Sequence, residues 1–355
     1  MEFLAHYGLF LAQAVTIVVA ILIVVGGIVA LGHRQKSERD GHIEVRHLND
    51  RYKHMADTIR HNVIDKSTLK VQDKAEKKVT KARAKLEKKA AKSAGKPGSE
   101  TDLAKKPRLF TLSFDGDIKA SATDSLREEI SAVLSQINEG DAILLKLESP
   151  GGMVHSYGLA ASQLQRITDA GVNLTVAVDK VAASGGYMMA CIADKIVAAP
   201  FAVIGSIGVL AQLPNFHRLL KKHDIDFELL TAGEYKRTLT LFGENTDKGR
   251  EKFVEELELT HSLFKEFVQR ARPSLDIDKV ATGEVWYGQN ALSEGLIDEL
   301  GTSDAYIQQH LEDWEVYEVR YVQKKHWQEK LGMAAESTLE RTFLKLWQRS
   351  RGPHI

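Results

Sequence analysis

The residues with the clearest chemical potential are a serine among small residues, a glycine pair and a lysine. Ser184 lies in Ala-Ala-Ser-Gly-Gly-Tyr at 182–187, Ser-Pro-Gly-Gly spans 149–152, and Lys236 lies in Gly-Glu-Tyr-Lys-Arg at 233–237. A serine hydroxyl attacks a carbonyl carbon efficiently only when a base accepts its proton and hydrogen-bond donors stabilise the oxyanion. The three motifs together therefore predict an acyl-transfer site.

Glycines in the first two motifs can supply the oxyanion donors that such a site needs. Gly151 and Gly152 follow an apolar segment, and a glycine pair can point its N–H groups at a ligand oxygen without obstruction by side chains. Gly185 comes directly after Ser184, at the start of an expected helix, where backbone N–H groups have no partner within the helix. We expect the two donors to come from Gly151, Gly152 and Gly185, although each motif by itself is also typical of an ordinary turn.

The base that would accept the serine proton is open between lysines and histidines. A lysine accepts a proton only as the neutral amine, and burial together with a second cation favours that form. Lys236 has such a setting, between Tyr235 and Arg237, while Lys180, four residues before Ser184, is a rival. A Ser-His-Asp arrangement would instead use one of four histidines, His155, His217, His223 and His261.

A second serine is a candidate for assisting the lysine. Ser206 lies between glycines in Ile-Gly-Ser-Ile-Gly at 204–208, where its hydroxyl could orient an ammonium group or relay its proton. The alternative is a serine that serves only the turn. A serine–lysine site uses neither a metal nor an organic cofactor, so we expect none.

The single cysteine limits other chemistries. Cys191 can form no intrachain disulfide, so the fold must rest on its core. Its surroundings, Met-Met-Ala-Cys-Ile-Ala, are typical of a small buried residue rather than of a thiol nucleophile.

Alternating apolar and amphipathic segments between Pro107 and Val322 predict the scaffold of the site. Repeated strand–turn–helix units indicate a mostly parallel sheet covered by helices, which is an α/β fold. Ser184 would then lie at a strand-to-helix turn, a position that exposes a hydroxyl well. The expected strands are 108–114, 142–147, 173–178, 195–198, 227–230 and 316–322. The expected helices are 122–137, 155–170, the segment after Ser184 to about 193, 246–272, 276–280, 289–294 and 303–310.

The first 33 residues are typical of a membrane anchor. Residues 8–31 contain no charged side chain, and a helix of this length, about 36 Å at 1.5 Å per residue, can cross a bilayer with tilt. A cleaved signal peptide would have a basic start and a shorter apolar core, whereas residues 1–7 contain Glu2 and neither lysine nor arginine. We therefore expect one retained N-terminal transmembrane helix in a lipid bilayer.

A polar linker region at 34–106 separates this anchor from the expected globular domain at 107–322. The whole chain has 48 basic and 48 acidic residues, but residues 66–96 hold twelve lysines and arginines against three acidic residues. Such a Lys/Ala-rich run cannot bury a core and is either a solvated helix or disordered. It would serve as a spacer or be attracted to anionic headgroups. Residues 323–355 form a tail whose stretch 339–347 is suited to packing or oligomer contacts.

Five motifs in this order resemble the signal peptide peptidase A (protease IV) family of membrane-anchored Ser-Lys peptidases. The resemblance covers residues 107–322 through motifs and the N-terminal segment by its layout. The motifs are Ser-Pro-Gly-Gly, Val-Asp-Lys-Val-Ala-Ala-Ser-Gly-Gly-Tyr, Ile-Gly-Ser-Ile-Gly-Val, Ala-Gly-Glu-Tyr-Lys-Arg and, at 283–301, Gly-Glu-Val-Trp-Tyr-Gly-Gln-Asn-Ala-Leu-Ser-Glu-Gly-Leu-Ile-Asp-Glu-Leu-Gly.

The resemblance implies a role for each candidate residue. Ser184 matches the nucleophile, Lys236 matches the general base, and Ser206 matches the serine that hydrogen-bonds this lysine. Gly151 and Gly185 match the oxyanion donors. The implied fold is a ClpP/crotonase-type α/β spiral of strand–turn–helix units.

The resemblance also implies partners and a location. Relatives with one catalytic domain form dome-shaped homo-oligomers in which adjacent protomers share each active site. Their substrates are extended apolar peptides, such as remnant signal peptides, and we expect no nucleic-acid partner. The implied location is the bacterial inner membrane with the catalytic domain in the periplasm, whereas Arg34, Lys36 and Arg39 after the apolar segment favour a cytoplasmic domain.

Two other functions are compatible with the same fold. A crotonase-like acyl-CoA hydratase or isomerase would share the oxyanion glycines but would use carboxylates in place of serine and lysine. A non-catalytic membrane scaffold would keep the fold and use none of these residues.

Overall fold

The computed structural model describes residues 41–65, 67–69 and 106–323, and a few single positions: Gln13, Val15, Thr16, Lys74, Lys78, Lys81, Ala82 and Lys85. The predicted anchor, most of the Lys/Ala-rich run and all but the first residue of the predicted tail lie outside these residues. Within the part of the chain that is described, no helix combines the length and the apolar character needed to cross a membrane. The chain divides into two compact units, one of residues 43–321 and one of the two ends.

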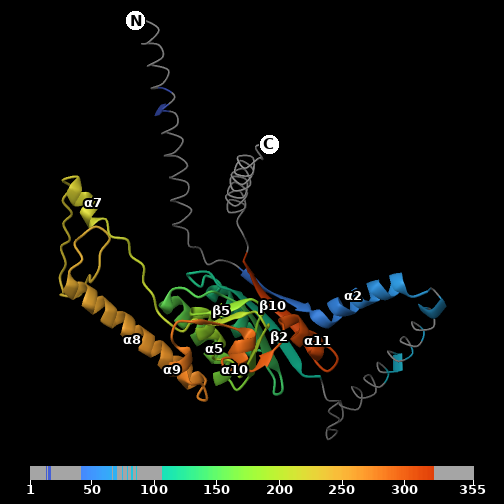
Figure 1. Ribbon diagram of the computed structural model, residues 1–355. Helices are drawn as coiled ribbons and strands as arrows, with labels where there is room; N and C mark the ends of the chain where they lie inside the picture. The colour runs from blue at the N-terminus through green and yellow to red at the C-terminus, as the bar shows by residue number, and fades with distance from the viewer. Residues whose placement is uncertain are drawn as a thin grey trace, which may run out of the picture. The chain divides into compact units, whose positions relative to one another are not determined.

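A seven-stranded sheet forms the centre of the fold and confirms the predicted α/β class (Figure 1). Its strand order is β1-β10-β2-β3-β4-β6-β9, and the pairs from β10 to β9 are all parallel. The strands are β1 (Gly41–His47), β2 (Arg108–Asp115), β3 (Ala142–Glu148), β4 (Asn173–Val178), β6 (Lys195–Ala198), β9 (Glu299–Leu300) and β10 (Glu315–Gln323). This arrangement of strand–turn–helix units fits a ClpP-like fold.

Alternate residues of the central strands bury two separate clusters, one on each face of the sheet. Leu112 and Leu145, which are neighbours in register, belong to the larger cluster, while Leu109 and Leu144 belong to the smaller one. The larger cluster is covered by α4 (Thr123–Leu134), α5 (Val154–Asp169) and α6 (Gly185–Ala190). The smaller one is covered by α2 (Leu48–Val63) and α11 (Ser303–His310). Because helices cover both faces of the sheet, side chains on both faces are buried, and this accounts for the near-continuous apolar strands in the sequence.

The segment predicted as a linker supplies two elements of this fold. β1 adds an edge strand beside β10, and α2 follows it directly. The Asn49 amide holds α2 in place by donating to the carbonyl groups of Leu311 and Trp314, both at 2.9 Å. Leu48 and Tyr52 place the first turns of α2 against the smaller cluster.

A second, three-stranded sheet carries the residues around the predicted nucleophile. Its order is β5 (Val181–Ala183), β7 (Val203–Gly205) and β8 (Val285–Tyr287), with β5 and β7 parallel. Helix α10 (Gly288–Ser293) follows β8 directly. β5 leads straight into Ser184 and α6, so the strand-to-helix turn predicted for Ser184 is confirmed.

An arm at residues 209–246 leaves this second sheet and returns through the longest helix. It contains α7 (His217–Lys222) and leads into α8 (Asp247–Ala271), after which α9 (Ile277–Val280) returns to the core. In Figure 1, α7 and its loops lie beyond the N-terminal end of α8. The predicted strand at 227–230 is wrong, because these residues pair with no strand: Phe227 packs on Phe242, and Leu230 is 90% exposed.

Candidate active site

Ser184 has a backbone conformation that residues other than glycine rarely adopt. It lies between β5 and α6 with φ 51° and ψ −117°. Two hydrogen bonds hold this conformation: the Ser184 N–H donates to the Gly205 carbonyl at 2.7 Å, and its own carbonyl accepts the Met188 N–H at 2.9 Å. A strained non-glycine residue costs about 1–3 kcal/mol and persists where the surrounding structure fixes it, often at an active site.

The glycine loop lies directly against this serine, although 32 residues separate Gly152 from Ser184 in the sequence. Gly151 has φ 89°, and a Cβ atom placed on it would lie 2.7 Å from the Gly185 nitrogen and 2.8 Å from the Ser184 Cβ. Only glycine fits both the conformation and the space. The structure therefore brings together two of the predicted motifs.

The N–H groups of the three glycines are not equivalent. The Gly151 N–H donates to the Ser149 hydroxyl oxygen at 3.1 Å and is thereby occupied. Among the hydrogen bonds of the described residues, none uses the N–H of Gly152 or of Gly185. Gly152 and Gly185 also line one small cavity with Ser184, which Gly151 does not. The geometry therefore favours Gly152 with Gly185 as the donor pair.

The remaining lining of this cavity is mainly apolar. Thr260 and Gly208 contribute to it, and the other lining side chains are Val154, Met188, Val209 and Phe264. Phe264 and Thr260 come from α8, so the returning helix closes one side of the cavity. An acyl group or apolar side chain beside Ser184 would meet hydrocarbon in most directions.

Ser206 directly follows β7, as Ser184 directly follows β5. Ala183 and Gly205 are register partners, so the two serines are the next residues of two paired strands, about 5 Å apart. Ser206 also has φ 51°, and its N–H donates to the Glu284 carbonyl at 2.7 Å. The structure thus places both predicted serines at the same edge of the second sheet.

Lys236 lies elsewhere, exposed on the arm and next to the first turns of α8. The neighbouring Glu234 carboxylate forms an ion pair with Lys248 at 2.6 Å. The ammonium groups of Lys248 and Lys252 lie 5.9 and 5.3 Å from the centre of the Tyr235 ring. The segment around Lys236 is therefore fixed to residues 248–252.

The length of α8 separates Lys236 from Ser184 within one chain. Thr260 of α8 lines the serine cavity, and Lys248 lies twelve residues earlier, which corresponds to about 18 Å along the helix axis. A lysine side chain reaches only about 6 Å, so Lys236 does not contact the Ser184 of its own chain.

The rival bases show no contact with the serine either. The Lys180 ammonium is exposed and pairs with Glu148 at 2.9 Å, and this hydrogen bond raises the pKa of Lys180, against what a base requires. His155 and His223 are exposed, and His217 lies on α7. His261 on α8 has a buried Nε2 atom without a hydrogen-bond partner among the described residues.

The sequence reasoning missed one set of residues at this site. The Ser149 hydroxyl, next to the glycine loop, lies 2.6 Å from the hydroxyl of Tyr157, and both side chains are fully buried. The only sequence signal was a tyrosine eight residues after the serine, on the apolar face of a predicted helix. Cys191, in contrast, is buried as expected, and burial raises the pKa of its thiol to about 12.

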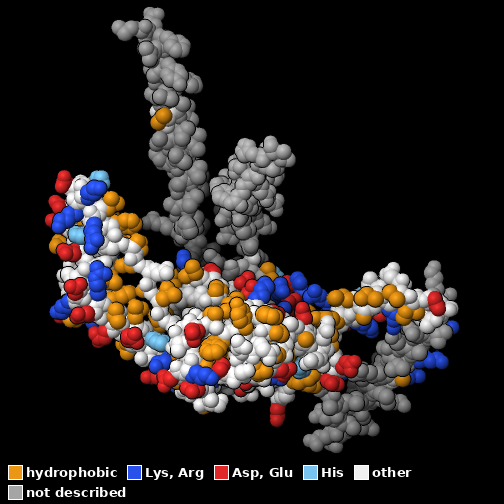
Figure 2. Space-filling model, viewed as in Figure 1, with side chains coloured by type: hydrophobic (Ala, Val, Ile, Leu, Met, Phe, Trp, Pro, Cys, Tyr) orange, Lys and Arg blue, Asp and Glu red, His pale blue; other side chains and the backbone are white. Residues whose placement is uncertain are grey.

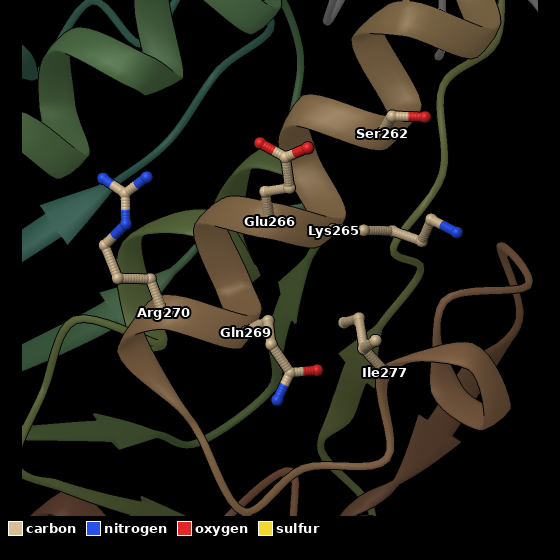
Figure 3. A pocket seen from close by; sticks show the side chains of 6 residues that line it. All are labelled: Ser262, Lys265, Glu266, Gln269, Arg270 and Ile277. Atoms are coloured by element: carbon tan, nitrogen blue, oxygen red, sulfur yellow. The ribbon is translucent and has the colours of Figure 1, made fainter.

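A larger groove of about 580 Å³ lies on the outer side of α8, away from these residues (Figure 3). Two of its polar side chains are engaged locally: Lys265 pairs with Asp278 at 3.4 Å, and Gln269 donates to the carbonyl groups of Pro273 and Leu275. Lys265 and Arg270 point in opposite directions in Figure 3. The groove contains none of the predicted site residues.

Comparison with known proteins gives matches along most of the chain. Residues 2–164 match the family model "Peptidase family S49 N-terminal", and residues 166–316 match "Peptidase family S49". "Probable protease SohB" of Haemophilus influenzae is 52% identical over 337 residues, which are 95% of this chain and 94% of that protein. "Probable protease SohB" of Buchnera aphidicola subsp. Acyrthosiphon pisum is 53% identical over 68% of this chain and 72% of that protein. "Protease 4" of Haemophilus influenzae is 29% identical over 46% of this chain and 27% of that protein. These matches confirm the resemblance found from the five motifs.

Proposed function

The chain belongs to peptidase family S49 and is a peptidase, and we propose that it is a serine endopeptidase with Ser184 as nucleophile and Lys236 of a neighbouring copy as general base. The single observation that carries this proposal is the Ser184 centre itself. A strained serine and two N–H groups without acceptors among the described residues belong to residues that line one cavity. These are the parts that acyl transfer requires apart from the base.

In the proposed reaction the neutral Lys236 amine accepts the Ser184 proton while the serine oxygen attacks the peptide carbonyl carbon. The N–H groups of Gly152 and Gly185 stabilise the resulting oxyanion. The C–N bond then breaks, and the leaving amine takes the proton from the lysine. Water next attacks the acyl-enzyme, giving one proton to Lys236, and Ser184 recovers its proton as the acid product leaves.

The distance along α8 supports a base from a neighbouring copy. Lys236 of the same chain lies beside residues 248–252 on an arm that contributes no residue to the two buried clusters, and Lys248 is about 18 Å along α8 from Thr260. The arm carries many exposed apolar side chains, which favours contact with a second copy. Figure 2 shows hydrophobic side chains on its surface. They include Leu210, Leu213, Phe216, Leu219, Ile225, Phe227, Leu229, Leu230 and Phe242.

The proposed substrates are extended apolar peptides, such as remnant signal peptides or other membrane-associated polypeptides. Residues 207–214 follow β7 outside any helix or strand, Gly208 and Val209 line the Ser184 cavity, and no described hydrogen bond engages the backbone of this segment. An extended peptide can pair with such a segment as an added strand. The apolar side chains around Ser184 would then contact one of its side chains.

We further propose that residues 8–31 anchor the chain in the bacterial inner membrane. Their length and lack of charge support one membrane-spanning helix. Treatment of spheroplasts with an external protease determines the side of the domain: degradation of the domain before lysis gives a periplasmic location, and degradation only after lysis gives a cytoplasmic one.

Covalent labelling tests the proposed nucleophile. A fluorophosphonate should label the full chain at Ser184, and Ser184→Ala should abolish both labelling and peptide hydrolysis. Ser162→Ala, which removes an exposed hydroxyl on α5, is the matched control and should leave both unchanged. Hydrolysis that persists in Ser184→Ala would contradict the proposal. An acyl-CoA enzyme or a scaffold on this fold would show no labelling of the wild-type chain.

A further inference from the structure

We propose that Tyr157 is a positioning residue for the oxyanion donors, whose hydroxyl acts through Ser149 to hold the Gly151–Gly152 peptide beside Ser184. The inference rests on the proposed function, because it assigns the support of the same oxyanion site. Neither Tyr157 nor Ser149 touches a substrate in this account. Both act through the backbone of the glycine loop.

A chain of three hydrogen bonds connects the glycine loop to Tyr157. The Tyr157 hydroxyl donates to the Asp117 carbonyl at 2.7 Å, which uses its only proton. The Ser149 hydroxyl must therefore donate to Tyr157 at 2.6 Å, and the Ser149 oxygen accepts the Gly151 N–H at 3.1 Å. The donor and the acceptor of each of the three hydrogen bonds are thus assigned.

The two hydroxyl groups in this series of hydrogen bonds are buried away from water. Ser149 and Tyr157 have no exposed surface, so a lost partner could not be replaced from solvent without a rearrangement. Burial raises the pKa of the Tyr157 phenol, which keeps it a donor at neutral pH. Gly116 makes the space for the two hydroxyls, since a Cβ on it would lie 2.4 Å from the Ser149 oxygen and 2.6 Å from the Tyr157 oxygen.

The Tyr157 ring also supports the second donor. A Cβ atom on Gly185 would lie 2.3 Å from Cγ of this ring, so the ring packs directly against the backbone of Gly185. One side chain therefore contacts Gly185 with its ring and reaches the Gly151 N–H through Ser149 with its hydroxyl. The two halves of the proposed oxyanion site share this single support.

The hydrogen bond at Gly151 decides which N–H group is free. Ser149 engages the Gly151 N–H, whereas the next residue, Gly152, lines the Ser184 cavity and its N–H has no partner among the described residues. Removal of the hydroxyl of Tyr157 should loosen the Gly151–Gly152 peptide without removing either donor. The loss should appear in the transition state, where the oxyanion exists, and not in substrate binding.

A pair of tyrosine substitutions tests the proposal on the full chain. Tyr157→Phe removes the hydroxyl and keeps the ring, while Tyr187→Phe removes the hydroxyl of another fully buried tyrosine, which donates to the Leu296 carbonyl at 2.9 Å. The assays are hydrolysis of a fluorogenic peptide amide with an apolar residue before the scissile bond, and inhibition by the peptide aldehyde of the same sequence. The aldehyde reacts with Ser184 to an adduct that carries an oxyanion, whereas the bound amide has a neutral carbonyl group until the serine attacks it.

The proposal predicts a split between these assays. Tyr157→Phe should lower kcat about 10- to 100-fold, less than the loss of a whole donor, and should weaken aldehyde inhibition by a similar factor, with KM within about twofold. Tyr187→Phe should lose comparable thermal stability but keep kcat within about twofold. Ser149→Ala should lower kcat as Tyr157→Phe does, and the double variant should lose little more than either one.

Two results would overturn the proposal in distinguishable ways. Equal kcat and aldehyde inhibition in Tyr157→Phe and Tyr187→Phe, with an active wild type, would show that Tyr157 has a structural role only. A wild-type chain that neither hydrolyses the amide nor binds the aldehyde would overturn the proposed function, and the positioning role with it.

Discussion

The Ser184 centre and the arm that carries Lys236 are built in opposite ways. Around Ser184 the backbone is strained, a Cβ atom added to Gly151 or Gly185 would lie less than 3 Å from a neighbouring atom, and the supporting side chains are fully buried. The arm has exposed apolar side chains and contributes no residue to the two buried clusters, and its aromatic rings pack on one another, as Phe216 does on Phe242 with ring centres 5.9 Å apart. The Ser184 centre therefore has all its contacts within one chain, whereas the arm leaves apolar side chains without a partner in the described part of the chain.

In our proposal, this difference keeps a reactive serine inactive in a single chain. The nucleophile and the oxyanion donors need positions fixed to within about half an ångström, which a buried core provides. The base has only to come close to Ser184, and in our proposal the assembly of several copies brings Lys236 of one copy next to Ser184 of another. A monomer would then hold a formed but inactive site.

The largest expected effect comes from the arm. Lys236→Ala should lower kcat/KM about 10²- to 10⁴-fold, because the general base is lost while the Ser184 centre stays intact. Lys180→Ala is the matched control and should change activity less than about twofold, since its ammonium is exposed and paired with Glu148. Steady-state kinetics on a fluorogenic peptide measures both. A loss in Lys180→Ala with full activity in Lys236→Ala would reverse the assignment of the base.

The next effect probes the fixed geometry of the serine centre. Gly151→Ala should lower kcat about 100-fold and destabilise the fold by about 2–3 kcal/mol, because the residue has φ 89° and no room for a Cβ atom. Gly158→Ala, seven residues away on α5, has open space around it and should be neutral or slightly stabilising. Activity and thermal unfolding of both variants provide the measurement. If both variants behave alike, the loop is not fixed as described.

A third prediction concerns the pH dependence of the buried core. Burial raises the pKa of Glu129 from 4.5 to about 7, while its carboxylate accepts the Tyr321 N–H at 2.8 Å. The folded chain therefore holds more protons than the unfolded chain between these pH values, and the free energy of unfolding falls as the pH rises through this window. Glu129→Gln keeps an acceptor for Tyr321 and should match the wild type near pH 4, yet be more stable by about 3 kcal/mol at pH 8.

The control for this pH effect is the neighbouring carboxylate. Glu128 lies on the same helix with a largely exposed side chain, so Glu128→Gln should alter the free energy of unfolding by less than about 0.5 kcal/mol at either pH. Urea unfolding at pH 4 and pH 8 gives the comparison. A stability difference between Glu129→Gln and wild type that is the same at both pH values would contradict a carboxyl group with a raised pKa.

The sequence allowed the sheet and the serine centre to be predicted because their signals are local. Continuous apolar strands, the amphipathic helices between them and the glycine positions all follow from short-range pattern. The strand predicted at 227–230 failed because an apolar run does not reveal whether it faces a core, a neighbouring aromatic ring or another molecule. β1 was missed because an edge strand in a polar segment has weak alternation and pairs with β10, far along the chain.

The finer features of the site depend on three-dimensional contacts. No pattern tells which of two adjacent glycines leaves its N–H free, since this is decided by the Ser149 hydroxyl. The distance between Ser184 and Lys236 depends on the length and direction of α8, and the sequence motifs give no information about either. The support by Tyr157 depends on the packing of α5 against the loop at 149–153.

A mixing experiment tests the division between the two regions most directly. Full-length Ser184→Ala and Lys236→Ala should each lose activity, but after dissociation and reassembly in equal amounts, a site can combine an intact serine with an intact lysine from another copy. Random assembly predicts recovery of about a quarter of wild-type activity, since each residue is intact in half of the chains. If crosslinking shows that the two variants assemble together and activity still does not return, Ser184 and Lys236 do not form one site across two copies.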